Sequence, residues 1–337
     1  MNLSFSTRGW ASCSWEEWID TATDMKFGGI EVYNAHKEGR LLEKGGPFHK
    51  YSISATVRML NEKKLFIPCL DSSCDLSLED GSAMQEVKEL MDIASDLRVK
   101  CVCAFASEEK QDVIEKAVSE LLDYAAKKNV ILLIKTSGVY ADTAKLRELM
   151  NHFACDELGA LWDVHHTCRD HRESPDETIK NLGAYVKHLH LRDSDDDLQY
   201  NLIGEGTLPI AGVMQALASI NYDGFISLEW KPEWMEDLQD REIIFPHFVN
   251  YMSRFSSPRT RKKSLYYNHD GTGQYVWKKD DLIDLTFPQV LDRMVEEFPD
   301  QYALSTPHWI TPVPTRNSGK MWTISPGLWY PWVSGPV

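Results

Sequence analysis

Over residues 1–256, eight short apolar runs alternate with longer stretches in which apolar residues recur every three or four positions. A short run bounded by turn residues predicts a buried strand, and the longer spacing predicts an amphipathic helix. Strands that alternate with helices of this kind are typical of βαβ units in a parallel sheet. We expect strands at Leu3–Ser6, Gly29–Tyr33, Phe66–Leu70, Cys101–Phe105, Ile131–Lys135, Ala160–Asp163, His188–Leu191 and Phe225–Glu229.

The stretches between these runs carry helix signals. Ser14 and Glu17 form a capping box, in which a serine caps the helix and a glutamate three residues later reaches back to it. Residues 82–97 carry a broad apolar stripe, and a last helix is expected over about 241–255. Eight such units predict an α/β fold, the (β/α)₈ barrel. An open doubly wound sheet is the alternative, but Ser6–Gly9 lacks the glycine-rich turn that usually follows its first strand.

The composition and the apolar periodicity of the sequence change after residue 256. Residues 257–280 include a polar, basic run without apolar periodicity, and we expect an interdomain linker there. A new amphipathic helix is predicted within 281–304, where Thr286 and Gln289 form its capping box. Residues 305–337 hold four Trp and six Pro but no Asp or Glu. This composition fits neither a core nor a typical disordered tail.

Four of the predicted strands end in an ionisable residue that faces the inside of the barrel. These residues are Lys135, Asp163, His190 and Glu229. Alternate residues of a strand share one side, and the active sites of such barrels lie at the carboxyl ends of the strands, so we expect the four at one mouth. Carboxylates and an imidazole suit Mn²⁺, Mg²⁺, Co²⁺ or Zn²⁺, which makes Asp163, His190 and Glu229 the candidate metal ligands. The plainer alternative is that these polar residues merely pair with one another.

Three more residues are candidate substrate contacts at the same mouth. They are Arg192, Glu31 and Tyr33. Glu31 and Tyr33 share the inward side of the second predicted strand. Arg192 lies just past His190, where its guanidinium is positioned to hold a substrate oxygen or phosphate. The alternative for Arg192 is a surface ion pair with one of the following acidic residues, Asp193 or Asp195.

Composition narrows the function classes. The net charge of −15 argues against a nucleic-acid partner, because binding phosphates requires a basic face. No apolar stretch approaches the length of a membrane span, and Met1 leads into a predicted strand rather than a signal sequence, so we expect no membrane partner. Seven scattered cysteines without zinc-type pairing fit a reducing compartment, and the cytoplasm is the expected location.

Residues 1–256 resemble the xylose isomerase-like TIM barrels, the sugar phosphate isomerase and epimerase superfamily that also includes inosose dehydratases, tagatose epimerases and endonuclease IV. The segments that carry the resemblance are Gly29–Tyr33, Asp163-x-x-His166, His188-x-His190-Leu191-x-Asp193, Gly204-Glu205-Gly206 and Tyr222–Glu229. Their combination is fairly specific for the superfamily but not for a substrate.

The resemblance implies roles for individual residues. The family binds its metal through Glu, Asp, His and Glu; the last three correspond to Asp163, His190 and Glu229, and the family's substrate-contacting histidine corresponds to His166. This chain has Lys135 where the family has its first glutamate, which is also a proton-transfer group in epimerases. A cation about 4 Å from a divalent ion costs on the order of 8 kcal/mol at an effective dielectric constant near 20.

Three outcomes are open for Lys135. The amine swings aside and a divalent metal ion binds weakly through three ligands, or the amine is a neutral base with a lowered pKa, or it replaces the metal as a fixed cation. In the last two cases Lys135 takes part in catalysis itself.

Residues 281–304 resemble the amino-terminal edge of AMP-dependent synthetases and acyl-CoA ligases, in which a helix precedes a turn like Phe298–Ala303. The nucleotide-binding and catalytic motifs of that family are absent from the sequence, so we expect no adenylating activity. In a shifted reading frame, 308–310 must encode Leu-Asp and 321–323 must encode Val-Asp. The remaining positions permit an acid-containing sequence with a helix end of the kind that adenylating enzymes have. We therefore interpret 305–337 as an out-of-frame or disordered tail on a chain that is naturally fused to an adenylating domain. The alternative is a genuine short extension.

Together these features predict a metal-assisted isomerase or epimerase that acts on a small sugar or polyol through an enediolate. Glu229 serves as ligand and base in this hypothesis. The rival is a catalytically impaired metabolite-binding module once fused to an acyl-CoA or AMP-forming ligase, with Lys135 as the mark of lost catalysis. A DNA-repair nuclease of the same fold is disfavoured by the acidic charge and by too few His and Asp at strand ends.

Overall fold

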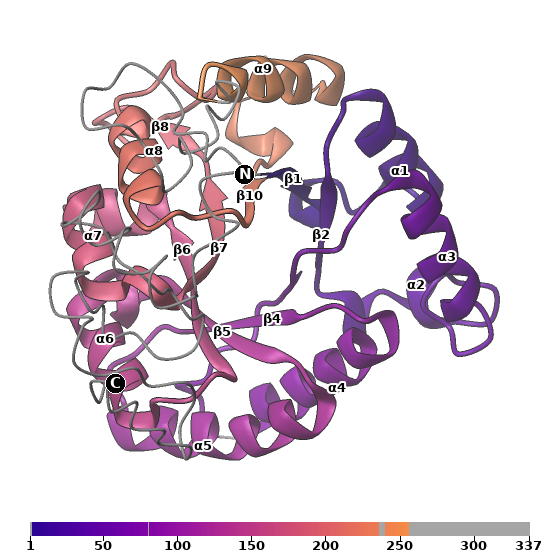
Figure 1. Cartoon of the computed structure of the whole chain (residues 1–337), viewed down its shortest axis with the longest axis horizontal. Helices are drawn as coiled ribbons and strands as arrows, with labels where there is room; N and C mark the ends of the chain where they lie inside the picture. The colour runs from indigo at the N-terminus through magenta and orange to yellow at the C-terminus, as the bar shows by residue number, and fades with distance from the viewer. Residues whose placement is uncertain (1, 80, 236–239, 256–337) are drawn as a thin grey trace, which may run out of the picture. The chain divides into compact units, whose positions relative to one another are not determined.

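The computed structural model describes residues 2–79, 81–235 and 240–255, which form a closed barrel of parallel strands (Figure 1). The barrel strands are β1 (Asn2–Ser6), β2 (Gly29–Tyr33), β3 (Leu70–Asp71), β4 (Cys101–Ala106), β5 (Ile131–Gly138), β6 (Leu158–Asp163), β7 (Val186–Leu191) and β10 (Phe225–Leu228). β1 closes the barrel by pairing in parallel with both β2 and β10. The predicted (β/α)₈ barrel is confirmed.

The chain divides into two units, Met1–Ser256 and Ser257–Val337. The predicted linker at 257–280, the adenylating-type helix at 281–304 and the tail at 305–337 all lie outside the described residues.

Helices follow the strands around the outside of the barrel (Figure 1). They are α1 (Trp15–Asp24), α2 (Gly39–Leu42), α3 (Ile53–Lys63), α4 (Ser82–Leu97), α5 (Gln111–Lys128), α6 (Thr143–Phe153), α7 (Pro175–Leu182), α8 (Ile210–Ser219) and α9 (Arg241–Ser253). A short antiparallel hairpin of β8 (Asp193–Ser194) and β9 (Tyr200–Asn201) follows β7. Among the described helices, none is long and apolar enough to cross a membrane.

Local sequence signals set several element boundaries. The capping box at α1 is present, because Ser14 accepts a hydrogen bond from the Glu17 backbone and Glu17 accepts one from the Ser14 backbone. The third strand was predicted at Phe66–Leu70, but β3 covers only Leu70–Asp71. Phe66 still forms an isolated parallel bridge with Gly29, but Pro68 has no N–H to give to a strand ladder. The ladder is therefore interrupted after Phe66, and its regular part covers Leu70 and Asp71.

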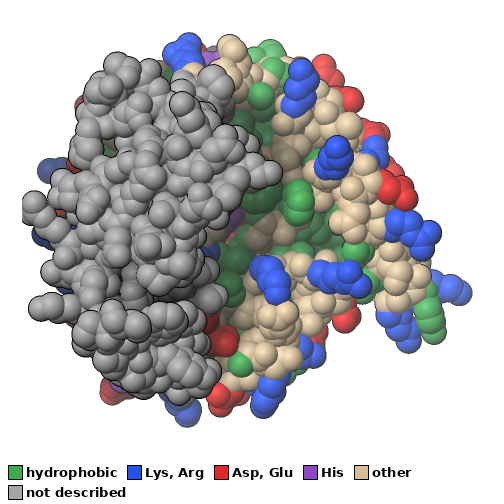
Figure 2. All heavy atoms as spheres, viewed as in Figure 1, with side chains coloured by type: hydrophobic (Ala, Val, Ile, Leu, Met, Phe, Trp, Pro, Cys, Tyr) green, Lys and Arg blue, Asp and Glu red, His purple; other side chains and the backbone are tan. Residues whose placement is uncertain are grey.

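Two apolar regions hold the barrel together. The larger one fills the layer between strands and helices, where for example the rings of Phe5 and Phe245 stack with centroids 4.7 Å apart. A smaller cluster is built from the inward residues of β4, β5 and β6 together with Cys69: Cys69, Cys101, Cys103, Leu133 and Leu161. Figure 2 shows acidic and basic side chains interspersed over the part of the face that the described residues occupy.

Candidate functional site

The three candidate metal ligands converge at the carboxyl ends of neighbouring strands. Asp163 is the last residue of β6, His190 lies opposite it in β7, and Glu229 directly follows β10. All three side chains are buried, and each offers a donor atom within 4.8 Å of the others. The strands thus bring together Asp163, His190 and Glu229, as the sequence predicted.

Glu31 holds His190 in a defined orientation. The Nε2 atom of His190 lies 2.8 Å from Glu31 Oε2, and His188 Nε2 lies 2.5 Å from the same oxygen. Because a carboxylate only accepts hydrogen bonds, a neutral His190 carries its proton on Nε2 and keeps a lone pair on Nδ1. Burial would raise the pKa of Glu31, but the two histidines hold it well below its ordinary value. Glu31 is buried and holds the rings of His188 and His190 in place through its carboxylate.

The Nδ1 atom of His190 faces the carboxylates and has no hydrogen-bond partner among the described residues. It lies 4.0 Å from Asp163 Oδ2. A buried polar atom without a partner costs about 1–3 kcal/mol, so a bare lone pair at this place calls for a ligand. An imidazole that donates through one nitrogen to a carboxylate and offers the other to an ion is the common arrangement of a metal-binding histidine.

Arg192 lies between the two candidate carboxylate ligands. Its NH1 atom donates to Asp163 Oδ2 at 2.9 Å and also to Glu229 Oε2. The expected alternative of a surface ion pair with the acidic residues that follow is wrong, because Arg192 is buried. Asp193 accepts hydrogen bonds from four backbone N–H groups instead, including those of Gly204 and Gly206.

Lys135 pairs with Asp71, a carboxylate that was not among the predicted site residues. Its Nζ atom donates to Asp71 Oδ2 at 2.8 Å, and both side chains are buried. Burial alone would lower the pKa of Lys135, but Asp71 raises it above its ordinary value. Of the three outcomes for Lys135, the pairing with Asp71 favours the amine that has swung aside from the candidate metal ligands, and the charged ammonium disfavours a neutral base.

Arg8 is the second missed residue. Its NH1 atom donates to Glu229 Oε1 at 2.5 Å, and its guanidinium carbon lies 5.1 Å from the centre of the Tyr33 ring. Tyr33 is only partly buried and reaches the ion-pair network through this contact. Asp71 directly follows the third predicted strand and Arg8 lies two residues after the first. Extending the strand-end rule by two positions would have found both.

His166 lies at the edge of the mouth with 30% of its side chain exposed. Its Nδ1 atom is 2.5 Å from Asp170 Oδ2, and its Nε2 atom is 3.8 Å from Asp163 Oδ2. The hydrogen bond from His166 lowers the pKa of Asp170. His166 is thus open to solvent and lies near a candidate metal ligand.

Aromatic rings lie over Arg192. The rings of His165 and Tyr200 stack at 5.3 Å, and the Tyr200 ring stacks on Trp234 at 4.1 Å. The guanidinium carbon of Arg192 is 5.7 Å from the centre of the Trp234 ring. Burial, followed by the Arg192 charge, lowers the pKa of His165 to about 4, so this histidine is neutral at pH 7. A cation at this distance from an indole face is attracted to it, which gives Arg192 a second partner beside the carboxylates.

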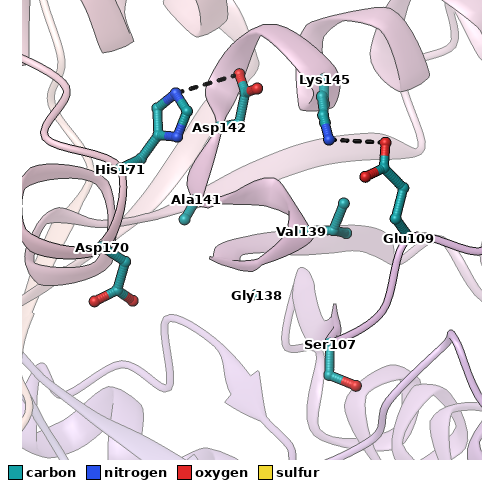
Figure 3. Close-up of a pocket in the computed structure, with 9 residues that line it drawn as sticks. All are labelled: Ser107, Glu109, Gly138, Val139, Ala141, Asp142, Lys145, Asp170 and His171. Atoms are coloured by element: carbon teal, nitrogen blue, oxygen red, sulfur yellow. Dashed lines mark hydrogen bonds and ion pairs between the residues drawn. The ribbon is translucent and has the colours of Figure 1, made fainter.

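A cavity of about 370 Å³ opens beside the ion-pair network, where the segments after β4, β5 and β6 meet (Figure 3). Asp170, which binds His166, lines it together with Ser107 and Asp142. Lys145 on the opposite wall pairs with Glu109 at 2.7 Å. The hollow is open to solvent, and its lining is mostly polar.

The charges at the mouth nearly balance. The cations are Arg8, Lys135 and Arg192, and the anions are Glu31, Asp71, Asp163 and Glu229. The net charge of these groups is −1 when the imidazoles are neutral. Burial opposes the ionisation of Asp163, but Arg192 and His166 hold its pKa well below its ordinary value. A divalent ion would change the total to +1, so the charge balance permits one ion. The donor set fits such an ion on the condition that Arg192 moves away from Asp163 and Glu229.

Solved structures with the same fold come from several enzymes. The probable 3-DHS dehydratase AsbF of Bacillus anthracis superposes with a TM-score of 0.63 at 17% identity, over 75% of this chain and 99% of that one. D-psicose 3-epimerase of Clostridium cellulolyticum H10, solved with D-tagatose, gives 0.62 at 14% identity, over 76% and 99%. The IOLI protein, solved with a zinc atom, gives 0.62 at 19% identity, over 76% and 98%. At these identities the likeness shows the shared fold.

The amino-acid sequence itself also matches known proteins. An uncharacterized protein of Methanocaldococcus jannaschii is 31% identical over 126 residues, which are 36% of this chain and 42% of that protein. The match to the family described as xylose isomerase-like TIM barrel is longer and extends over residues 19–244. It includes the strand ends that carry Glu31, Lys135, Asp163 and His190, and Glu229 just after β10. The chain therefore belongs to the xylose isomerase-like TIM barrel family.

Proposed function

We propose that this barrel is a sugar or polyol isomerase or epimerase that moves a proton next to a carbonyl group with the help of a divalent ion. Asp163, His190 and Glu229 would hold the ion. The observation that carries the proposal is the convergence of these three donors within 4.8 Å, with Nδ1 of His190 unpartnered among the described residues. When bound, the ion would polarise the carbonyl and stabilise negative charge on the substrate oxygens.

The residues around the candidate ligands would have separate positioning and binding roles. Glu31 keeps the His190 proton on Nε2, so that Nδ1 stays available. His166, at the edge of the mouth, would bind a substrate hydroxyl, and the nearby cavity would hold the rest of a small hydroxylated molecule. Arg192 would leave the two carboxylates and remain at the face of Trp234, which it already approaches.

The base assignments favour isomerisation over epimerisation. Glu229 would remove the proton, since it is a buried carboxylate at the centre of the network. Epimerisation needs a proton-transfer group on each face of the substrate carbon, and Lys135 stands where the family has the second one. Asp71 raises the pKa of Lys135, which makes the ammonium a weak proton donor at neutral pH. A single base that returns the proton on the same face suffices for isomerisation.

The substrate class is inferred from the fold relatives. A D-psicose 3-epimerase was solved with D-tagatose, and the IOLI protein was solved with zinc. These proteins suggest a small polyhydroxylated substrate and a divalent ion for this chain too. The natural fusion to an adenylating domain stays a prediction.

Proton exchange with solvent tests the proposal. The full chain would be loaded with Mn²⁺ and incubated in D₂O with a panel of ketoses, aldoses and cyclic polyol ketones. We expect deuterium next to the carbonyl of at least one compound, measured by mass spectrometry. Glu229→Gln should abolish the exchange, and the control Glu205→Gln, at an exposed glutamate, should retain it. Exchange that survives Glu229→Gln, or no exchange with the whole panel, would refute the proposal.

A second candidate is a metabolite-binding module without turnover. It is favoured by one observation: Lys135 and Arg192 already supply positive charge at the mouth through their pairs with Asp71, Asp163 and Glu229. Such a module would gain thermal stability from a hydroxylated or anionic ligand but would catalyse no exchange. Measuring both quantities on the same panel separates the two functions.

A further inference from the structure

A second group of metal-binding side chains lies where β2, β3 and α4 meet. His36 follows β2, Cys74 follows β3, and Glu86 is in the second turn of α4. Each offers a donor atom within 4.8 Å of the other two. We propose that these three residues bind a zinc ion, a site that is separate from the barrel mouth and independent of the proposed function.

Backbone hydrogen bonds fix the segments that carry His36 and Cys74. Asn34 adopts a left-handed backbone conformation (φ 48°) and accepts a hydrogen bond from the Ser73 backbone at 2.9 Å. This contact ties the segment after β2 to the segment after β3. The carbonyl of Cys74 accepts a hydrogen bond from the Phe105 backbone at 3.1 Å, which fixes Cys74 against β4. The imidazole and the thiol are thus placed by the backbone rather than by each other.

His36 provides the independent sign of a ligand. Only 3% of its side chain is exposed, yet neither ring nitrogen makes a hydrogen bond to any described residue. Its Nε2 atom is 3.4 Å from Glu86 Oε2, close enough for an ion pair but not aligned for a hydrogen bond. Burial lowers the pKa of His36, so its imidazole is neutral and keeps a lone pair. A buried imidazole without a hydrogen bond requires an explanation, and a metal ion is a sufficient one.

The distances within the group match the edges of a zinc tetrahedron. With bonds of about 2.3 Å to sulfur and 2.0 Å to nitrogen or oxygen, tetrahedral geometry puts sulfur and oxygen about 3.5 Å apart and nitrogen and oxygen about 3.3 Å apart. Cys74 Sγ lies 3.3 Å from Glu86 Oε2, and His36 Nε2 lies 3.4 Å from the same oxygen. Glu86 Oε2 thus lies at about a tetrahedral distance from the other two donors, and all three donors lie within 4.8 Å of one another.

The chemistry of the group also suits zinc. Thiolate, carboxylate and imidazole are all zinc ligands, and one thiolate with one carboxylate neutralises the two charges of the ion. The thiol of Cys74 would lose its proton to solvent as the sulfur–zinc bond forms. Lys37 Nζ now pairs with Glu86 at 2.8 Å and would withdraw; its side chain is 47% exposed, so the loss is small. Glu86 is 32% exposed, which gives the ion a path from solvent.

Cobalt substitution tests this site specifically, because a sulfur ligand gives Co²⁺ a charge-transfer band that oxygen and nitrogen ligands do not give. The full chain would be stripped with chelator, kept reduced with a phosphine and titrated with Co²⁺. We expect one equivalent to produce the sulfur band and visible bands of tetrahedral cobalt, and Zn²⁺ to displace them. The barrel mouth has no sulfur among its candidate ligands, so Asp163→Asn should leave the band unchanged.

Single substitutions test which residues bind the zinc ion. Cys74→Ser should abolish the band, and the control Cys155→Ser, at a half-buried thiol elsewhere, should keep it. Glu86→Gln should keep the sulfur band but weaken Zn²⁺ affinity by more than the roughly 10–100-fold that loss of an outer-shell partner costs. Lys37→Met should tighten binding. Circular dichroism would confirm that each variant is folded.

The proposal falls if the wild-type chain gives no sulfur band at saturating Co²⁺, or if the band survives in folded Cys74→Ser. A folded Glu86→Gln variant with unchanged Zn²⁺ affinity would remove Glu86 from the site and also overturn the three-ligand proposal.

Discussion

On the side formed by β4, β5 and β6, the barrel interior is apolar in the middle of the strands and ionised towards their carboxyl ends. Leu133 and Leu161 lie in the apolar cluster, while Lys135 and Asp163, each two residues further along the same strands, belong to the ion-pair network. Two residues of strand are only about 7 Å, so the change is abrupt. Packing alone satisfies the first region, whereas each charge in the second must find a partner because it is buried.

The largest effect is expected when a charge is moved into the apolar region. Leu133→Asp would place a carboxylate in the apolar cluster, with Cys103 and Gly159 as its register partners on the neighbouring strands. We expect it to prevent folding, whereas the control Leu133→Ala should lose about 2–5 kcal/mol and remain folded. Urea unfolding followed by circular dichroism measures both. Equal stability of the two variants would show that this end of the barrel admits water and that the comparison is wrong.

The next largest effect should come from breaking one pair in the ionised region. Asp71→Asn leaves the Lys135 ammonium buried beside a neutral amide and should cost about 3–5 kcal/mol of unfolding free energy. The double variant Asp71→Leu with Lys135→Met removes both charges and should recover most of that loss. A double variant as unstable as Asp71→Asn alone would mean that shape rather than charge pairing fixes these two residues.

The third prediction concerns Arg192, because its side chain decides whether Asp163 and Glu229 are available to bind an ion. Arg192→Met removes the cation between Asp163 and Glu229, and Mn²⁺ affinity should rise at least tenfold, which is about 1.4 kcal/mol. The control is Arg169→Met, whose guanidinium binds Ser194 rather than a candidate ligand. Calorimetric titration gives both affinities. An unchanged affinity in Arg192→Met would show that Arg192 does not compete with an ion.

The smallest effect concerns the edge of the mouth. The hydrogen bond from His166 lowers the pKa of Asp170, so the folded state binds this proton more weakly than the unfolded state, whose aspartate pKa is about 3.9. The contribution to stability is therefore present above that pH and is lost as the pH falls through the folded pKa. His166→Gln should move the Asp170 pKa upward in a carboxyl NMR titration. If the Asp170 pKa is the same in both proteins, the close contact at 2.5 Å does not persist in solution.

Strand ends were the most informative part of the sequence. The alternation of apolar runs was enough to predict the barrel, and the strand-end rule placed Asp163, His190 and Glu229 together, because parallel strands end at one edge. The extent of β3 was not predictable from apolar character alone, since Pro68 interrupts the ladder between the bridge at Phe66 and the paired residues from Leu70 on.

What the sequence could not reveal was which charge pairs with which. The Lys135–Asp71 pair spans 64 positions along the chain, and the bridge by Arg192 joins β6 to the end of β10 across β7. Such choices depend on side-chain reach inside the closed barrel, which no local pattern encodes. The role of Glu31 is similar: its strand position was clear, but its two histidine partners come from the opposite half of the chain.

We infer that a divalent ion can replace the Arg192 side chain between Asp163, His190 and Glu229. Anomalous diffraction from crystals of the full chain grown with Mn²⁺ is the direct test. We expect an anomalous peak within bonding distance of Nδ1 of His190 and of both carboxylates, with the guanidinium of Arg192 withdrawn towards Trp234. A map that shows no peak there at saturating Mn²⁺, with Arg192 still joining Asp163 to Glu229, would contradict the claim.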